Sequence, residues 1–199
     1  MNPNEFAAAT AVTMKVPAVS ITSSWELDPS HSTVQFSVRH LMISRVHGTF
    51  ARVTANLTLD RALLSRSKIT ASIEAASVDT REPRRDEHLR GVEFFDVITF
   101  PMLTFSSKRL ELMTGTTDQY LLTGDLTMRG ITREIALTVD SSTSEVKDPS
   151  GRVKIGASAT AKLNRKDFGL GWNATLETGG VLVGEEVTIT LDLQFVRKD

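Results

Sequence analysis

The chain has 199 residues, of which 40% are apolar and 24% are charged, a composition typical of a folded soluble domain. Its 23 Lys and Arg residues nearly balance 24 Asp and Glu residues, so net charge alone would not hold a nucleic acid or an anionic membrane. Because the chain has no cysteine, disulfides, thiolate metal sites and a cysteine nucleophile are excluded. We therefore expect one domain and no nucleic-acid partner.

The N-terminal region carries no recognisable targeting signal. Its mildly apolar run from Phe6 to Met14 follows Glu5, where a secretory signal would carry Lys or Arg. No stretch approaches the roughly 20 apolar residues of a membrane-spanning helix. We therefore expect no transmembrane segment and a cytoplasmic location. Residues 1–24 lack clear periodicity and are interpreted as a flexible extension, which leaves residues 25–199 as a single domain.

Apolar and polar residues alternate after Ser32, where Val34, Phe36, Val38 and His40 fall on one face. This period of two predicts a half-buried strand. The pattern returns seven times, in residues 53–59, 69–75, 103–105, 120–128, 131–139, 153–163 and 187–195. Turn residues separate most of these segments and favour antiparallel hairpins. The sequence therefore predicts eight strands.

The connection between the third and fourth predicted strands is different. It carries a charged run of helix-forming residues at 84–90, followed by Phe94 and Phe95, and predicts a short helix closed by Gly91. The inward strand faces mix large residues with alanines and Gly124, which leaves space inside. An eight-stranded barrel that holds one small ligand and a two-sheet sandwich fit this pattern about equally well.

The histidines offer little sign of a metal site. Their spacing in the sequence matches no metal-binding helix, so we predict no metal. His40 shares a face with Phe36 and Val38, and its imidazole needs a partner there. The partner could be a carboxylate, a ligand head group or a backbone group. We favour the interpretation that His40 bonds to the backbone or lies at the barrel rim. The four histidines are His31, His40, His47 and His88.

No residue set marks a catalytic centre. Arg84, Arg85 and Arg90 surround two acidic residues, which suggests either an anion-binding patch or, as we favour, a solvated helix face with internal ion pairs. The chain has no Gly-x-Ser-x-Gly elbow and no phosphate loop. We therefore predict no catalytic residues.

Several motifs are similar to those of one family. The segment from Trp25 to His31, with the alternating strand after it and then Gly48 and Phe50, resembles the opening of the YceI-like family of polyisoprenoid-binding proteins. Segments 78–80 with 85–89 and 94–97, 122–133, and 164–169 resemble its later motifs. The match runs in order from Trp25 to Phe195.

This resemblance implies an all-β fold, an eight-stranded antiparallel lipocalin-like β-barrel with a short helical segment between strands 3 and 4. It favours the barrel over the sandwich. The implied ligand is a long apolar chain in a tunnel, such as a polyprenyl compound, a quinone or a fatty-acid-like lipid, held for storage, shielding or transport. Many relatives work in the periplasm, which is the alternative location, and a homodimer is a possible assembly.

The expected site is the tunnel and its mouth, with no cofactor besides the bound lipid. Two alternatives stay open: an enzyme that pairs His40 with a carboxylate in the same cavity, and a barrel filled by side chains that acts as an interaction module. The residues predicted to line the tunnel or mouth are Val34, Phe36, Val38, His40, Phe50, Ile73, Phe94, Phe95, Phe105, Leu122, Ile135, Leu137, Ala157, Ala159, Phe168, Trp172, Ile189 and Leu191.

Overall fold

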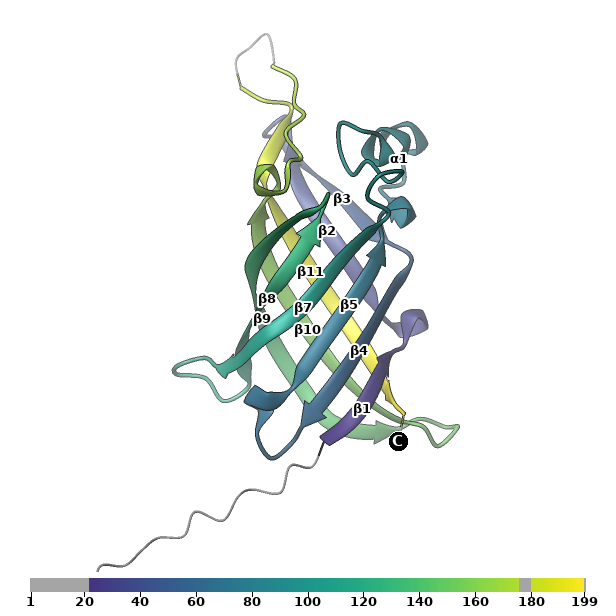
Figure 1. Ribbon diagram of the computed structural model, residues 1–199, viewed down its shortest axis with the longest axis vertical. Helices are drawn as coiled ribbons and strands as arrows, with labels where there is room; N and C mark the ends of the chain where they lie inside the picture. Colours follow the sequence, from purple (N-terminus) through teal and green to yellow (C-terminus); the bar gives the residue numbers. More distant parts are fainter. Residues whose placement is uncertain (1–21, 176–179, 199) are drawn as a thin grey trace, which may run out of the picture.

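A computed structural model describes residues 22–175 and 180–198 (Figure 1). It shows an elongated barrel with α1 at one end, here called the upper end, and the C-terminus at the lower end. The strands are β1 (Thr22–Leu27), β2 (Thr33–His40), β3 (Ser44–Phe50), β4 (Val53–Asp60), β5 (Lys68–Glu74), β6 (Val78–Asp79), β7 (Met102–Leu112), β8 (Gln119–Met128), β9 (Ile131–Lys147), β10 (Val153–Asn164) and β11 (Val183–Arg197). The helices are α1 (Pro83–Arg90) and the short 3-10 helices η1 (Pro29–His31), η2 (Leu64–Arg66), η3 (Ala75–Ser77) and η4 (Arg165–Phe168).

The sheet closes on itself. Its order runs β1-β4-β5-β7-β8-β9-β10-β11, and β11 returns to pair with β1. β2 pairs with an earlier part of β11, so β1 and β2 together act as one interrupted strand. Two more strands are interrupted in the same way. Residues 51–52 separate β3 from β4, and η3 separates β5 from β6. The circuit therefore has eight antiparallel positions, which confirms the predicted barrel.

The alternation did not reveal β1, β3 or β6. β1 begins at Thr22, because Thr22 pairs with Asp60 and Ser23 with Leu59, so the domain boundary expected after Ser24 moves toward the N-terminus. Ser23 hides the pattern, since it is a buried polar residue whose hydroxyl accepts a 2.8 Å hydrogen bond from the Trp25 indole. The rest of the expected extension, residues 1–21, lies outside the described residues.

The helix predicted after the third strand is present as α1. The Glu82 side chain accepts hydrogen bonds from the backbone N–H groups of Arg84 and Arg85, and so caps the N-terminus of the helix. Pro83 occupies the first helical position, where no N–H is needed. Gly91 ends the helix, as predicted. No helix in the described ranges has the length and apolar content needed to cross a bilayer.

The charged run of α1 attaches the helix to β6, and the expected internal ion pairs are absent from the described part of the chain. The Arg85 guanidinium donates to the hydroxyl and the carbonyl of Thr80, both at 2.7 Å. Asp86 is buried and accepts from the Thr80 N–H at 2.9 Å and from its hydroxyl at 2.5 Å. Arg90 donates to the Val78 carbonyl at 2.7 Å. The predicted internal ion pairs were therefore wrong, whereas Arg84 and Glu87 are exposed, as expected of a solvated helix face.

Glycines let two phenylalanines pack closely inside the barrel. A Cβ on Gly48 would lie 2.3 Å from the Phe36 ring, and one on Gly124 would lie 2.5 Å from the Phe105 ring. Toward the lower end lies a compact apolar cluster. Its buried members are Trp25, Leu27, Ala55, Leu59, Ile155 and Phe195. All of them except Trp25 also border free interior space, so this cluster forms part of a cavity wall.

Candidate functional site

The barrel interior holds two cavities. The upper chamber, about 360 Å³, is enclosed by the inner faces of β2 and β3, by α1, by the Phe94–Phe95 pair and by the segment before β11. The lower chamber, about 240 Å³, is enclosed by the inner faces of β4, β5 and β7–β11. The upper volume falls within the range of small-molecule sites. An interior of this kind argues against a barrel filled by side chains.

Leu103, Met128 and Ile189 line both cavities, and we call these three residues the waist. Leu103 and Met128 are 5% and 7% exposed, so neighbouring atoms surround them. Ile189 is only partly buried although it points inward. Its free surface therefore faces the cavities, and the two chambers adjoin at this level.

Both linings are overwhelmingly apolar. Neither contains an Asp or a Glu among the described residues. The lower chamber has Ser67, Lys68, Ser107 and Tyr120 as its polar side chains. The polar side chains of the upper chamber are His40, Thr80, Arg84, Arg85, His88 and Arg165. A long apolar chain would therefore meet few polar groups, and all three arginines of the two linings belong to the upper chamber.

Arg165 is the most buried of these cations, at 3% exposure. Its guanidinium donates to the Gly184 and Trp172 carbonyls, both at 2.9 Å, and to the Leu170 carbonyl. Burial lowers the pKa of Arg165. The side chain therefore joins η4, the segment after it and the start of β11, and fixes one wall of the upper chamber.

His88 lies at the mouth of the upper chamber between two aromatic rings. Its ring meets Phe94 and Trp172 edge to face, with centroids 4.9 and 4.7 Å apart. Its Nε2 lies 2.7 Å from a carboxylate oxygen of Glu93, whose side chain is 54% exposed. This pair stands in solvent at the rim. His40, the residue of the enzyme hypothesis, has no carboxylate beside it in the described lining.

Seventeen of the eighteen predicted residues line a chamber. Phe36, Val38, His40, Phe50, Phe94, Phe95 and Trp172 line the upper one. Val34, Ile73, Phe105, Leu122, Ile135, Leu137, Ala157, Ala159 and Leu191 line the lower one, and Ile189 lines both. Their contact with a ligand stays a prediction.

Phe168 is the exception and corrects the expected lining. It is 1% exposed and belongs to the buried cluster with Phe94 and Leu170. The turn of η4 directs it into packed side chains, so it supports the chamber wall without facing the space.

Sequence reasoning missed several lining residues. Val46 comes from β3, a short strand in which exposed Arg and His residues alternate with Val46 and with a glycine that has no apolar side chain. Leu182 and Val183 precede the clear period of β11. Arg165 gave no signal, since a buried arginine that binds backbone carbonyls cannot be distinguished in sequence from a surface one. The alternation of Val46 with Gly48 is the one signal that could have revealed β3.

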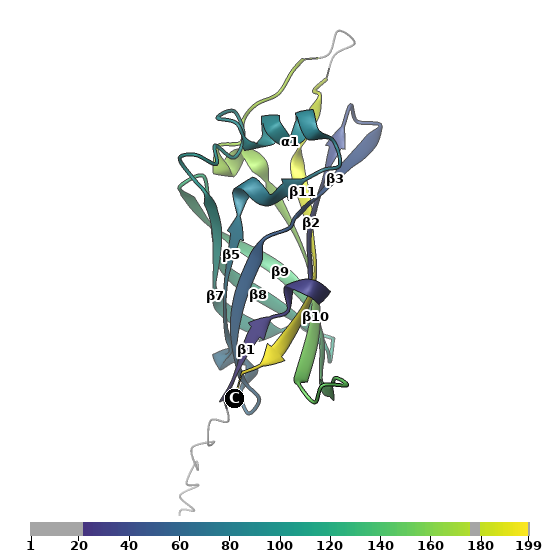
Figure 2. The same ribbon diagram turned by 90° about the vertical axis from the view of Figure 1, so that its right-hand side faces the viewer.

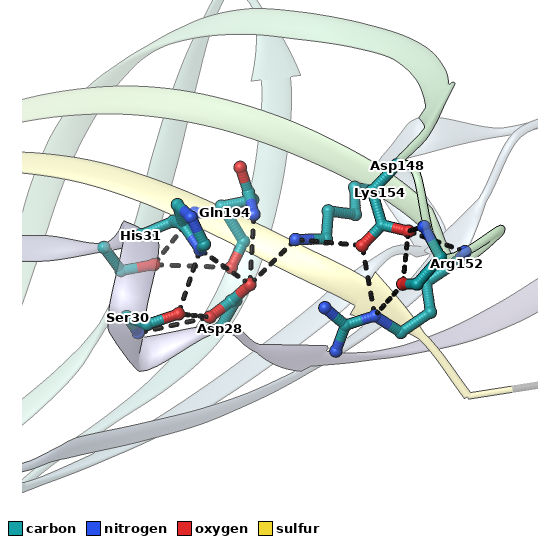
Figure 3. A network of polar contacts seen from close by, with 9 residues as sticks. Asp28, Ser30, His31, Asp148, Arg152, Lys154 and Gln194 are labelled. Carbon is teal, nitrogen blue, oxygen red and sulfur yellow. Dashed lines mark hydrogen bonds and ion pairs between the residues drawn. The ribbon is translucent and has the colours of Figure 1, made fainter.

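Ser30, His31 and Asp28 lie together on the outside of the barrel (Figure 3). A nucleophilic triad needs the serine and the acid on opposite ring nitrogens. Here both the Ser30 hydroxyl, at 2.9 Å, and the Asp28 carboxylate, at 3.0 Å, approach Nδ1 of His31. Asp28 also accepts directly from the Ser30 hydroxyl at 2.5 Å. The arrangement therefore shapes the η1 turn and forms no triad.

The same carboxylate anchors a wider polar network. Lys154 is 12% exposed, and its Nζ lies 3.1 Å from Asp28 and 3.4 Å from Asp148 (Figure 3). Hydrogen bonds to the Asp28 carboxylate hold its pKa well below the usual range. The bond from the Ser30 hydroxyl has the largest effect, and those from Lys154 and His31 have smaller ones. This network links the η1 turn to the β9–β10 hairpin. Across residues 22–175 and 180–198, no group of three or more His, Asp or Glu residues could hold a metal ion.

Comparisons with known proteins place the chain among related barrels. The UPF0312 protein SA2479 of Staphylococcus aureus is 31% identical over 173 residues, covering 87% of this chain and 97% of that protein. The YCEI protein of Campylobacter jejuni is 29% identical with a TM-score of 0.67, covering 81% of this chain and 90% of that one. A polyisoprenoid binding domain from Saccharophagus degradans, 15% identical, shares the fold at a TM-score of 0.60 over 88% of this chain and 99% of that one.

The model of the YceI-like domain matches residues 25–195, which is the whole barrel apart from the ends of its first and last strands. The match agrees with the antiparallel circuit and with the motifs around α1 that attach it to β6. This chain therefore belongs to the YceI-like family.

Proposed function

We propose that the protein binds a long-chain lipid or isoprenoid inside the barrel, for storage, shielding or transport. The observation that carries the proposal is a pair of adjoining chambers whose linings contain no acidic residue and are almost entirely apolar. Each methylene taken from water into such a space contributes about 0.8 kcal/mol. A related fold described as a polyisoprenoid binding domain supports this ligand class.

The chambers also suggest how such a ligand is oriented. The apolar chain would occupy the lower chamber, and the polar head would lie beneath α1, near His40 and Arg84. Arg85 and Arg165 already donate to protein oxygens, so they are less available to a head group. We propose no cofactor and no metal, because filling an apolar cavity requires no bond to be made or broken.

Mass spectrometry of organic extracts tests the proposal directly. Protein purified without detergent is extracted, and the extract is compared with that of an equal amount of an unrelated protein prepared in the same way. We expect a long-chain apolar molecule in a fixed ratio to protein. A fluorescent polyprenyl analogue should then bind the delipidated protein at one site. If no lipid is extracted and the analogue shows no saturable binding, the chambers serve another purpose.

A further inference from the structure

The hairpin between β2 and β3 exposes apolar residues at its tip. Met42 is 59% exposed and Ile43 is 81% exposed. Leu41 and Met42 have φ angles of 52° and 60°, in the left-handed region that hairpin turns usually fill with Asn or Gly. Strain and exposed apolar surface therefore coincide at one turn. Neither helps the barrel to fold, so the turn is better explained by a contact outside the protein.

The base of this tip is cationic. Arg39 and Arg45 are direct partners across β2 and β3, and both are exposed. Like charges placed opposite each other in an antiparallel pair destabilise it. Neither guanidinium forms an ion pair with a carboxylate in the described part of the chain; Arg45 donates only to the Ser37 hydroxyl, at 3.3 Å. Residues 37–49 contain two arginines and two histidines and no acidic residue. An anionic surface would relieve this repulsion.

The tip stands beside the mouth of the upper chamber. The same hairpin supplies Val38, His40 and Val46 to the chamber lining. Figure 2 shows the hairpin and the segment that follows α1 at the same end of the barrel. That segment carries two further exposed apolar residues, Val92 at 70% and Ile98 at 91%. Two segments at this end of the barrel therefore carry exposed apolar residues.

We propose that the β2–β3 tip docks the protein on an anionic lipid bilayer. Met42 and Ile43 would enter the boundary between head groups and acyl chains, while Arg39 and Arg45 would bind lipid phosphates. An apolar tip above a cationic base matches a bilayer, in which anionic phosphates lie above apolar acyl chains. A protein partner would need an apolar pocket surrounded by acidic groups. Docked in this way, the upper chamber opens onto the membrane. The purpose of docking rests on the proposed lipid binding.

Vesicle sedimentation tests the docking. The full chain is mixed with vesicles of phosphatidylcholine alone, or of phosphatidylcholine and phosphatidylglycerol in equal parts. The double variant Met42→Ser/Ile43→Ser removes the apolar tip, and Arg39→Gln/Arg45→Gln removes the cations. The matched control, Leu112→Ser/Val146→Ser, removes two residues that are 55% and 62% exposed and lie at the ends of β7 and β9, away from the hairpin between β2 and β3.

We expect the wild type to prefer the anionic vesicles and to release them as salt screens the charges. The apolar variant should bind about tenfold more weakly, which corresponds to about 1.4 kcal/mol. Loss of each guanidinium should weaken binding to anionic vesicles about fivefold. The control should bind like the wild type. Failure of the wild type to bind, or an equal loss in the control, would overturn the proposal, as would hairpin-dependent capture of a protein without vesicle binding.

A second measurement separates docking from cargo binding. The fluorescent polyprenyl analogue is titrated in buffer without vesicles, where both hairpin variants should match the wild type, because none of the four replaced side chains lines a chamber. Reduced analogue binding in these variants would contradict the assignment of the tip to docking. A wild type that binds vesicles but not the analogue would instead refute the proposed cargo and leave docking supported.

Discussion

The waist between the two chambers offers a sharp test of how the barrel uses its interior. Replacing Ile189 by Trp should close the passage to the lower chamber. Ile189 lines both cavities and is only partly buried, so the larger ring can occupy empty space. The same change at Leu103 or Met128, which are surrounded by other atoms, would overpack the core at about 1–3 kcal/mol.

The magnitude follows from chain length. In the wild type, each methylene added to a saturated chain should contribute about 0.8 kcal/mol, or about a fourfold decrease in Kd, until the lower chamber is full. In the Ile189→Trp variant, this gain should stop once the upper chamber is full. If the ring excludes three methylenes, the longest chain should bind about 2.4 kcal/mol more weakly, or about fiftyfold.

The assay is competition of fatty acids of increasing length against a fluorescent analogue, paired with thermal unfolding. Thr190→Trp is the matched control, because Thr190 is the next residue of β11 and is exposed on the outer face. It should leave the length dependence unchanged. If the Ile189→Trp variant keeps the wild-type slope for every chain, or if it only lowers the melting temperature, then ligands do not pass the waist and the reasoning is wrong.

Three further changes should act on stability. Arg165→Met should cost about 3 kcal/mol or more, measured by urea unfolding, because the buried Leu170 carbonyl and the partly buried Gly184 and Trp172 carbonyls lose this donor. Gly124→Ala should cost about 1–3 kcal/mol because the new Cβ meets a backbone oxygen at 2.6 Å, whereas Gly156→Ala should be tolerated, since its nearest contact is 3.7 Å away. The lowered pKa of Asp28 contributes stability above its unfolded value of about 4, and this is lost as the pH falls below that value. Asp28→Asn should therefore lower stability at neutral pH and flatten the decline measured by acid titration.

Alternation predicted β8 and β10 over nearly their full length, because inward apolar residues alternate there with polar ones. It covered only residues 103–105 of β7, 131–139 of β9 and 187–195 of β11, and in β7 the buried Ser107 hides the period. The short strands β3 and β6 escaped prediction, because few residues establish a period. In β3 the exposed Arg45 and His47 do alternate with the inward Val46 and Gly48, but a glycine has no apolar side chain to show the pattern.

The lining residues of β2, β5 and β7 to β11 followed from the same parity. Phe94, Phe95 and Trp172 lie outside the strands and Phe50 lies in β3, so parity did not predict them, and Phe168 belongs to a turn and faces no cavity. The role of Arg165 depends on carbonyls that the fold brings together from η4 and β11, and no local pattern encodes that meeting.

The interruptions of three neighbouring strands occur at one level of the barrel. The break between β3 and β4 lies beside η3, which separates β5 from β6, and two hydrogen bonds bridge it: Ala51 N–H to the Ser77 carbonyl, at 3.1 Å, and Arg52 N–H to the Ser77 hydroxyl, also at 3.1 Å. The break between β1 and β2 falls opposite the same residues.

This alignment divides one side of the barrel into two panels, while β7 to β11 run past the break as continuous strands (Figure 1). The upper panel of β2, β3 and β6 carries the hairpin tip and, through Thr80, α1. We predict that this panel opens locally more readily than the lower ladder, because the short strand β6 pairs only with β3 among the described strands, while β2 stays paired with β11. Amide hydrogen exchange should therefore be faster in the upper panel than in β4 and β5, which would give the proposed lipid an entry route while the base of the barrel stays folded.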